Sequence, residues 1–230
     1  PTGTSYRNAA VVNLFYWCNW VHDRLYQLGF TEAAGNFQSQ NFGKGGEGAD
    51  RVLAEAQDGG GTNNANFATP PDGLAPRMQM YLWNKSTPDR DGDFDTEIIL
   101  HEYVHGLSQR LVGGGAGITE EQSGGLSEGW SDFYALALLS QSGDALGGNY
   151  AFPAYSAIGG FKSSGDNYYF GLRRFPYSTN LTKNPLTFSD IDPTQAVIPG
   201  GVPYASFDPD SAGEVHNAGE IWCSMLWEAR

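Results

Sequence analysis

Apolar residues recur at helical spacing in three long segments of the chain. The first covers roughly residues 5 to 29, the second runs from Ile98 through Val104 and Leu107 to Leu111, and the third covers roughly residues 126 to 140. Apolar positions three or four residues apart fall on one face of a helix. The pattern therefore predicts three helices, each with a buried face.

The regions around these segments have a different pattern. Residues 35 to 100 carry short apolar runs, among them RVLAEAQ and RMQMYLW, which predict strands between loops. The Gly-rich stretch LVGGGAGITEEQSGG separates the second and third predicted helices and suits a turn between them. An irregular, Pro-containing stretch covers roughly residues 160 to 210, and helical spacing returns in EVHNAGEIWCSML. The chain is therefore expected to be an α+β protein.

The second predicted helix carries two of the four histidines of the chain, His101 and His105. They are four residues apart, so both imidazoles face the same side of the helix. Glu102 lies about 100° around the helix from His101. In this H-E-x-x-H arrangement, two neutral imidazoles bind zinc and the glutamate is a general base. A helix with two packed histidines can also fit the pattern by chance, so a third ligand has to decide.

A catalytic zinc ion takes three protein ligands and keeps the fourth position open. Ser108 and Leu111 stand where the longer pattern HExxHxxGxxH needs glycine and histidine, which excludes that class. The remaining histidines, His22 and His216, are distant in the sequence, and His22 is expected to be structural. A carboxylate ligand is therefore expected from the next acids along the chain, Glu120, Glu121 and Glu128.

Glu128 is the preferred third ligand. It opens the third predicted helix, whereas Glu120 and Glu121 lie in the Gly-rich loop, where no rigid element would aim them. Asp132 follows four residues later on the same face, where a carboxylate can accept the second N–H of a metal-bound histidine. Each acid alone also suits the first turn of an ordinary helix. The pair after an HExxH helix favours the metal interpretation.

Composition and charge exclude several functional classes. The formal net charge of −13 over 230 residues disfavours nucleic acids and anionic membranes as partners. No apolar run is long enough to span a bilayer, and polar residues such as Asn13, Asn19 and Asp23 interrupt the first helix, which is therefore no signal peptide. Cys18 and Cys223 could form one disulfide or remain as buried thiols.

The two metal-binding segments together, HEYVHGLSQRL and GGLSEGWSDF, resemble the fungalysin family of secreted zinc metalloproteases, in the thermolysin-like group with a glutamate ligand. Similar segments extend over nearly the whole chain, from YRNAAVVNLFYWCNW to EVHNAGEIWCSML. The resemblance implies a thermolysin-like zincin fold, with a mixed N-terminal lobe (residues 1–112) that ends in the zinc-binding helix. A mainly helical lobe (residues 113–230) would carry the third ligand, with the HExxH helix between the lobes.

The resemblance also bears on the wider protein. It implies an extracellular enzyme and a chain trimmed at both ends relative to the family. It further implies a precursor with an inhibitory propeptide. The expected partners are protein or peptide substrates, with no nucleic acid and no membrane.

Further site residues follow from the resemblance. His216, in DSAGEVHNAG, resembles the family histidine that stabilises the oxyanion, and either Asp210 or Glu214 would orient it. Asn64 and Ala65, in NNANF, resemble the edge strand whose backbone pairs with an extended peptide.

Two weaker candidates for substrate contact come from the residues themselves. Tyr168 and Tyr169 lie together in SGDNYYFG, and Tyr169 is preferred as a substrate contact. Arg173 and Arg174 are adjacent, and Arg173 is preferred as a partner of a substrate carbonyl. Surface arginines and structural tyrosines are common, so neither residue type identifies a site alone.

Four aspartates alternate in PDRDGDFDTE, at positions 89, 91, 93 and 95, just before the HExxH helix. The spacing resembles the start of a calcium-binding loop. Gly92 is misplaced for such a loop and no glutamate closes it, so Ca²⁺ is the weaker alternative. The acids are expected to cap the helix and to complement its N-terminus.

These observations predict a secreted zinc endopeptidase with one catalytic Zn²⁺. One alternative is a zinc aminopeptidase, although no acidic motif that would anchor a substrate N-terminus is found. The other is a non-catalytic, zinc-stabilised fragment or binding module. Glu102 argues against that alternative, because a purely structural zinc site has no use for a base.

Overall fold

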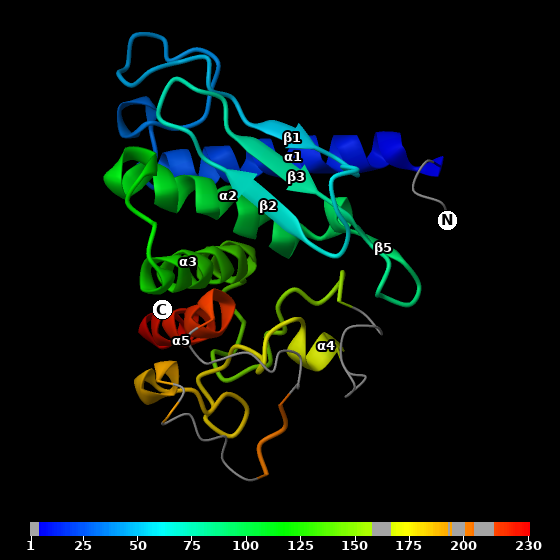
Figure 1. Cartoon of the computed structure of the whole chain (residues 1–230). Coiled ribbons are helices and arrows are strands. Elements are labelled where there is room, and N and C mark those ends of the chain that lie inside the picture. The colour runs from blue at the N-terminus through cyan, green and yellow to red at the C-terminus, as the bar shows by residue number, and fades with distance from the viewer. Residues whose placement is uncertain (1–4, 158–166, 193, 195–200, 205–213) are drawn as a thin grey trace. The chain divides into compact units, whose positions relative to one another are not determined.

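The computed structural model describes residues 5–157, 167–192, 194, 201–204 and 214–230 (Figure 1). The chain divides into two compact units. Unit one consists of Pro1–Trp83 and Asp91–Thr119, and unit two consists of Asn84–Arg90 and Glu120–Arg230. Helices and small sheets are both present, as expected for an α+β fold of the thermolysin-like zincin type. The lobe boundary expected after residue 112 stays a prediction.

Unit one contains a three-stranded sheet in the order β1-β3-β2. β1 (Leu53–Glu55) runs parallel to β3 (Arg77–Met80), and β2 (Ala65–Ala68) runs antiparallel to β3. The strands predicted in RVLAEAQ and RMQMYLW are thereby confirmed. β4 (Leu82–Trp83) and β5 (Arg90–Asp91) form a second, two-stranded sheet. Within the described residues, β2 is an edge strand of the larger sheet.

Two long helices pack beside this sheet. α1 (Arg7–Gln27) contacts β1 and α2, and α2 (Thr96–Leu111) contacts β2 and β3 (Figure 1). The first predicted helix is confirmed, with ends two residues inside the expected bounds. Apolar side chains of both helices fill the core between them and the sheet: Ala10, Leu14, Val21, Leu25, Ile98, Ile99, Leu100, Val104 and Leu107. Short 3-10 turns connect the elements at Glu32–Ala34, Gly92–Phe94 and Gly113–Gly115.

The start of α2 agrees only in part with the expectation for the four aspartates. Asp95 is the N-cap and accepts a hydrogen bond from the backbone N–H of Ile98, as predicted. Asp91 caps the preceding 3-10 turn by accepting the N–H of Asp93. Asp93 itself caps nothing, so the expectation is wrong there. Its carboxyl group is buried beside Asp91, and burial, with a further contribution from Asp91, raises its pKa to about 8.

The other end of α2 is held by a buried arginine. Arg110 Nη1 donates hydrogen bonds to Asp50 and Asp72, each over 2.9 Å, and to the carbonyl of Gly35 over 3.0 Å. The guanidinium group also lies 4.7 Å from the centre of the Phe37 ring. A buried charge is tolerated only when it is paired and hydrogen-bonded, as here. The helix that carries the HExxH motif is therefore fixed at both ends.

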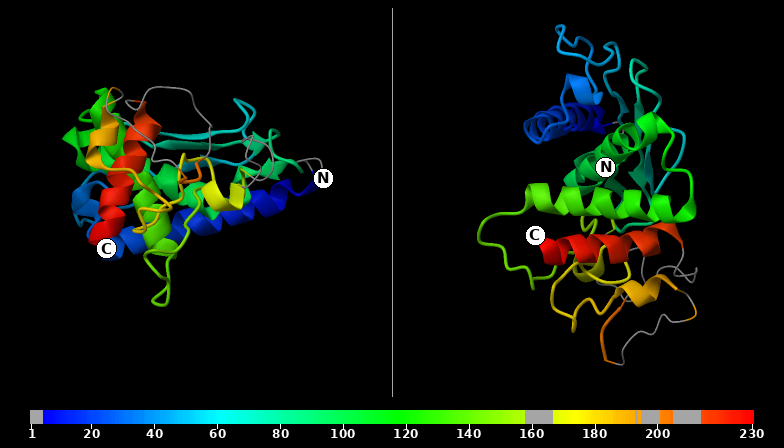
Figure 2. Two further views of the ribbon diagram at one scale, coloured as in Figure 1. Left: turned by 90° about the horizontal axis from the view of Figure 1, so that it is seen from below. Right: turned by 90° about the vertical axis from the view of Figure 1, so that its left-hand side faces the viewer.

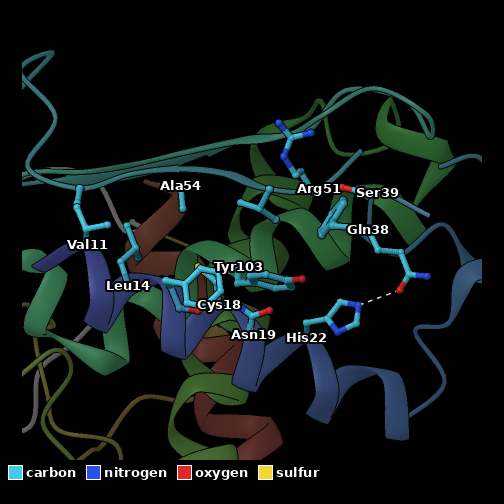
Figure 3. Close-up of a pocket in the computed structure, with 14 residues that line it drawn as sticks. Val11, Leu14, Cys18, Asn19, His22, Gln38, Ser39, Arg51, Ala54 and Tyr103 are labelled. Carbon is cyan, nitrogen blue, oxygen red and sulfur yellow. Dashed lines mark hydrogen bonds between the residues drawn. The ribbon is translucent and has the colours of Figure 1, made fainter. Parts of the chain in front are cut away.

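A cavity of about 420 Å³ opens in unit one between α1 and β1 (Figure 3). Its lining is mainly apolar, with Val11, Leu14 and Ala54 among the residues drawn, and Tyr103 of α2 contributes as well. His22 also lines it and lies 3.1 Å from Gln38 Oε1, in keeping with the structural role expected for this histidine. None of the predicted site residues that the structure describes lines this cavity.

Unit two is built on two helices that lie side by side and run parallel, α3 (Glu121–Leu139) and α5 (Val215–Ala229) (Figure 2). Glycines allow the close approach: a Cβ atom added to Gly129 would lie 2.6 Å from the carbonyl oxygen of Gly219. α3 begins earlier than the predicted residue 126, because Glu120 and Ser123 form a capping box. Short helices lie at Asn167–Phe170 (α4) and at Phe188–Ile191.

Both cysteines are free thiols, so the disulfide alternative is not realised. Burial, together with the charge of Asp93, raises the pKa of Cys18 to about 12, which keeps the thiol protonated. Across the described residues, no helix has the length and apolar character that crossing a membrane requires.

Candidate metal centre

The two histidines of the HExxH motif face each other on α2. The Nε2 atoms of His101 and His105 lie 3.0 Å apart, and the rings meet edge to face with centroids 4.7 Å apart. His101 is buried and His105 half-buried. Two nitrogens that each lie about 2.0–2.1 Å from a tetrahedral zinc ion are about 3.3 Å apart. The observed spacing therefore fits a shared metal ion with only a small adjustment.

Glu128 completes a set of three donors. One ligand atom from each of His101, His105 and Glu128 lies within 4.8 Å of the other two, and the three residues form a group that could hold a metal ion. Two imidazoles and one carboxylate are a donor set that suits a catalytic zinc site with an open fourth position. Among the described residues, the aspartates that precede α2 do not form such a group.

Glu102 is buried at the position directly after the first histidine, with 6% of its surface exposed. Successive helical residues are about 100° apart. The side chain of Glu102 therefore lies next to the face that carries His101 and His105, but not in line with them. A buried carboxylate beside a metal-binding pair is suited to accept a proton from a water molecule.

Asp132 lies one turn after Glu128 on α3 and is the centre of a buried network in unit two. Arg173 binds it through two hydrogen bonds: Nε lies 2.6 Å from Oδ2 and Nη2 lies 2.8 Å from Oδ1. The Tyr177 hydroxyl donates to the same Oδ2 atom over 2.5 Å. Arg173 Nη2 also lies 3.9 Å from Glu128 Oε2. The network thus reaches a residue of the metal-binding group.

His216 lies in the first turn of α5, where its partner can be identified. Its Nδ1 atom lies 2.6 Å from Oε1 of Glu214, the N-cap residue of the helix. Its Nε2 atom lies 3.6 Å from Glu128 Oε2. Partial burial lowers the pKa of His216, but the hydrogen bond with Glu214 and the charge of Glu128 outweigh burial and raise it. Asp210, the other candidate to orient His216, lies outside the described residues.

The candidate substrate contacts have different surroundings. Asn64 is exposed just before β2, and Ala65 is the buried first residue of that edge strand. Tyr169 lies in α4 with its ring against Phe170. Arg173 is 7% exposed and holds Asp132, and Arg174 binds Glu220. Substrate binding by Asn64, Ala65, Tyr169 and Arg173 stays a prediction.

Tyr177 belongs to no motif that the sequence predicts as part of the site. It is 45 residues from Asp132 in the sequence and follows an irregular stretch, so no helical or strand period relates the two residues. The sequence predicts Arg173 only as a substrate contact. Only the tertiary structure identifies both side chains as partners of Asp132.

The fold and the donor set define the class of the protein. An HExxH helix, with a glutamate ligand on a later helix of an α+β fold, is characteristic of thermolysin-like zincins. A family model described as fungalysin metallopeptidase (M36) matches residues 1–230. The chain belongs to this family, as the sequence motifs predicted, and the family is one of zinc-dependent enzymes.

Individual relatives agree with this assignment. The chain is 45% identical over 226 residues to "Probable extracellular metalloproteinase 2" of Arthroderma benhamiae. The aligned region covers 97% of the chain and 32% of the relative. It is 45% identical over 228 residues to "Extracellular metalloproteinase mep" of Aspergillus fumigatus, covering 98% of the chain and 32% of the relative. "Extracellular metalloproteinase 4" of Arthroderma gypseum is 46% identical over 228 residues, covering 98% of the chain and 31% of the relative.

The chain thus spans about a third of the length of the curated relatives that it matches. The names of these relatives are all those of extracellular metalloproteinases, in agreement with the predicted secretion.

Proposed function

We propose that the protein is a secreted zinc endopeptidase that hydrolyses internal peptide bonds of proteins. One Zn²⁺ would be held by His101, His105 and Glu128. The proposal is carried by one observation: these three donors lie within 4.8 Å of one another. Glu102, which directly follows His101 in the sequence, supplies a fourth side chain beside them. A buried base beside an open metal site is an arrangement for catalysis rather than for structural support.

Each residue of the site has its own role in hydrolysis. When bound, zinc supplies Lewis acidity, which polarises a peptide carbonyl and makes water a nucleophile near neutral pH. Glu102 accepts the proton of the attacking water and delivers it to the leaving amine. His216 donates a hydrogen bond to the oxyanion that develops on the carbonyl oxygen. Glu214, 2.6 Å from His216 Nδ1, orients the ring for this role.

An extended substrate would pair with the edge strand β2. An antiparallel edge offers free backbone groups to an added strand, and Asn64 and Ala65 lie at its start. Tyr169 and Arg173 remain the proposed side-chain contacts. Asp132 would accept the second N–H of a ligand histidine, which fixes the orientation of that imidazole ring.

The relatives are about three times as long as the matched region, so their chains hold further segments. We infer that the precursor carries a propeptide that inhibits the enzyme before secretion. To test this inference, the full-length protein is secreted from a host cell. Its peptidase activity is then measured before and after removal of the segment that precedes the mature enzyme.

The activity is tested with an internally quenched peptide blocked at both ends. We expect cleavage that 1,10-phenanthroline abolishes and added zinc restores. An aminopeptidase would require a free N-terminus and would leave this peptide intact. Zinc binding without cleavage of any peptide would instead support the non-catalytic binding module.

The base is tested by Glu102→Gln, which keeps the shape of the side chain and removes its charge. General-base catalysis contributes about 10²- to 10⁴-fold, so kcat should fall by at least 100-fold. Zinc content, measured by elemental analysis, should remain near one ion per chain. The matched control is Glu121→Gln, at an exposed position of α3, which should keep wild-type kcat. Normal turnover by the Glu102→Gln variant would contradict the mechanism.

A further inference from the structure

Tyr177 is a buried residue of unit two to which the proposed mechanism gives no part. Its side chain is fully buried, and its backbone pairs with Tyr150 through two hydrogen bonds of 2.8 and 3.2 Å. The position of its hydroxyl group is therefore set by a fixed stretch of main chain. Burial, with a smaller effect of Asp132, raises the pKa of Tyr177 well above its usual range, so the phenol keeps its proton and remains a donor.

The hydroxyl group adds a hydrogen bond to a buried ion pair. Asp132 and Arg173 form a two-pronged contact, and Asp132 Oδ2 accepts both the Arg173 Nε donor over 2.6 Å and the Tyr177 hydroxyl over 2.5 Å. Asp132 is 1% exposed and Arg173 is 7% exposed. A buried carboxylate has lost its hydration, so hydrogen-bond donors have to replace it. Donors on both of its oxygens also fix its orientation.

The orientation of this ion pair bears on the metal centre. Arg173 Nη2 donates to Asp132 Oδ1 and lies 3.9 Å from Oε2 of Glu128, the proposed third ligand. The guanidinium carbon of Arg173 also lies over the ring of Phe152, 5.4 Å from the ring centre. If the Asp132 carboxylate turns, the positive charge of Arg173 moves relative to Glu128. The contacts thus form a series from Tyr177 through Asp132 and Arg173 to Glu128.

We propose that Tyr177 is a positioning residue of the metal centre, which fixes the Asp132 carboxylate and, through Arg173, the carboxylate of Glu128. The inference rests on the proposed zinc site. It assigns the hydroxyl group of one tyrosine a function distinct from packing of its ring. Groups that orient metal ligands from outside the coordination sphere change metal affinity by about 10- to 100-fold when they are removed.

The test is Tyr177→Phe, which removes only the hydroxyl group. The zinc Kd is measured by competition with a chromogenic chelator, and the free energy of unfolding of the metal-free protein is measured by urea titration. Tyr150→Phe is the matched control, because its hydroxyl also donates one hydrogen bond in unit two, to the carbonyl of Ala145 over 2.7 Å. We expect the zinc Kd to rise about tenfold for Tyr177→Phe and to stay at the wild-type value for Tyr150→Phe.

A double variant tests the route of the effect. If Tyr177 acts through Asp132, Tyr177→Phe should weaken zinc binding far less in an Asp132→Asn background than in the wild type. A Tyr177→Phe protein with wild-type zinc Kd and lower stability would show a structural role alone and overturn the proposal. Equal, additive effects in both backgrounds would also overturn it. A wild-type protein that binds no zinc would contradict the proposed function itself, which separates the two failures.

Discussion

At the scale of single residues, a buried carboxyl group gives the protein a pH dependence that is independent of metal binding. Asp93 is fully buried, its Oδ2 atom accepts the N–H of Gln57, and no hydrogen-bond partner is described for its Oδ1 atom. Burial, followed by the effect of Asp91, raises its pKa from 3.8 to about 8. The folded protein therefore keeps a proton that the unfolded chain releases.

The sign of the resulting pH dependence follows from proton binding. Between pH 3.8 and about 8 the folded state binds more protons at Asp93 than the unfolded state, so this residue makes stability fall as pH rises. Asp93→Asn should remove this contribution, because an amide does not titrate. We expect the free energy of unfolding of the variant to fall less steeply than that of the wild type from pH 5 to pH 8, measured by urea titration.

Asp89→Asn provides the control for this prediction. Asp89 lies in the same segment but is exposed, so its replacement should leave the pH profile of the wild type unchanged. An Asp93→Asn protein with the wild-type slope would contradict the buried, protonated state of Asp93.

Single residues also differ in how far the sequence could identify them. His101, Glu102 and His105 lie on one helix, where the period of 3.6 residues alone fixes their relative directions. Glu128 could be preferred over Glu120 and Glu121 only by assuming where the next helix begins. No such period relates Asp132 to Tyr177, because an irregular segment lies between them. Local geometry is readable from sequence, whereas contacts made by loops depend on the whole fold.

At the scale of elements, the packing of α3 against α5 depends on the absence of side chains. Gly125 and Gly129 of α3 face Ala218, Gly219 and Trp222 of α5. A Cβ atom at Gly129 would lie 2.6 Å from the Gly219 carbonyl oxygen and 2.8 Å from Trp222 Cβ. The helices therefore approach more closely than ordinary side chains permit, with Glu128 next to the contact.

Gly129→Ala tests this packing. Alanine favours a helix over glycine by about 1 kcal/mol, but overpacking against a backbone atom destabilises by about 1–3 kcal/mol. We expect a net loss in the free energy of unfolding, measured by urea titration. The matched variant is Gly143→Ala, where an added Cβ meets nothing within 4 Å and the change should stay within about 0.5 kcal/mol. Equal stability of the two variants would show that the helices tolerate a wider spacing.

Helix positions were predicted well where the apolar period is strong and less well at helix starts. α1 agrees closely with the expected span because its apolar residues extend almost to both ends. α3 starts earlier than expected because its first turn is polar and Gly-rich, and the capping box of Glu120 and Ser123 begins it. Side chains that cap a helix act through hydrogen bonds, which a hydrophobic pattern does not register.

At the scale of the whole molecule, the proposed zinc ion should contribute to stability as well as to catalysis. Its ligands come from two helices, α2 and α3, with the Gly-rich segment between them in the sequence. A ligand that binds only the folded state stabilises it by about 2.7 kcal/mol when its free concentration is 100 times its Kd. For a chain of this size that corresponds to a rise in Tm of roughly 5 to 10 °C.

Removal of the metal should therefore destabilise the whole chain. Dialysis against a chelator should lower Tm, and added zinc should restore it, as measured by differential scanning calorimetry. Glu128→Gln should lose most of this zinc-dependent rise, because an amide is a poorer zinc ligand than a carboxylate. Glu121→Gln should keep the full rise, since Glu121 is an exposed first-turn acid of the same helix. A full rise in the Glu128→Gln protein, or its loss in the Glu121→Gln protein, would assign the third ligand to another residue.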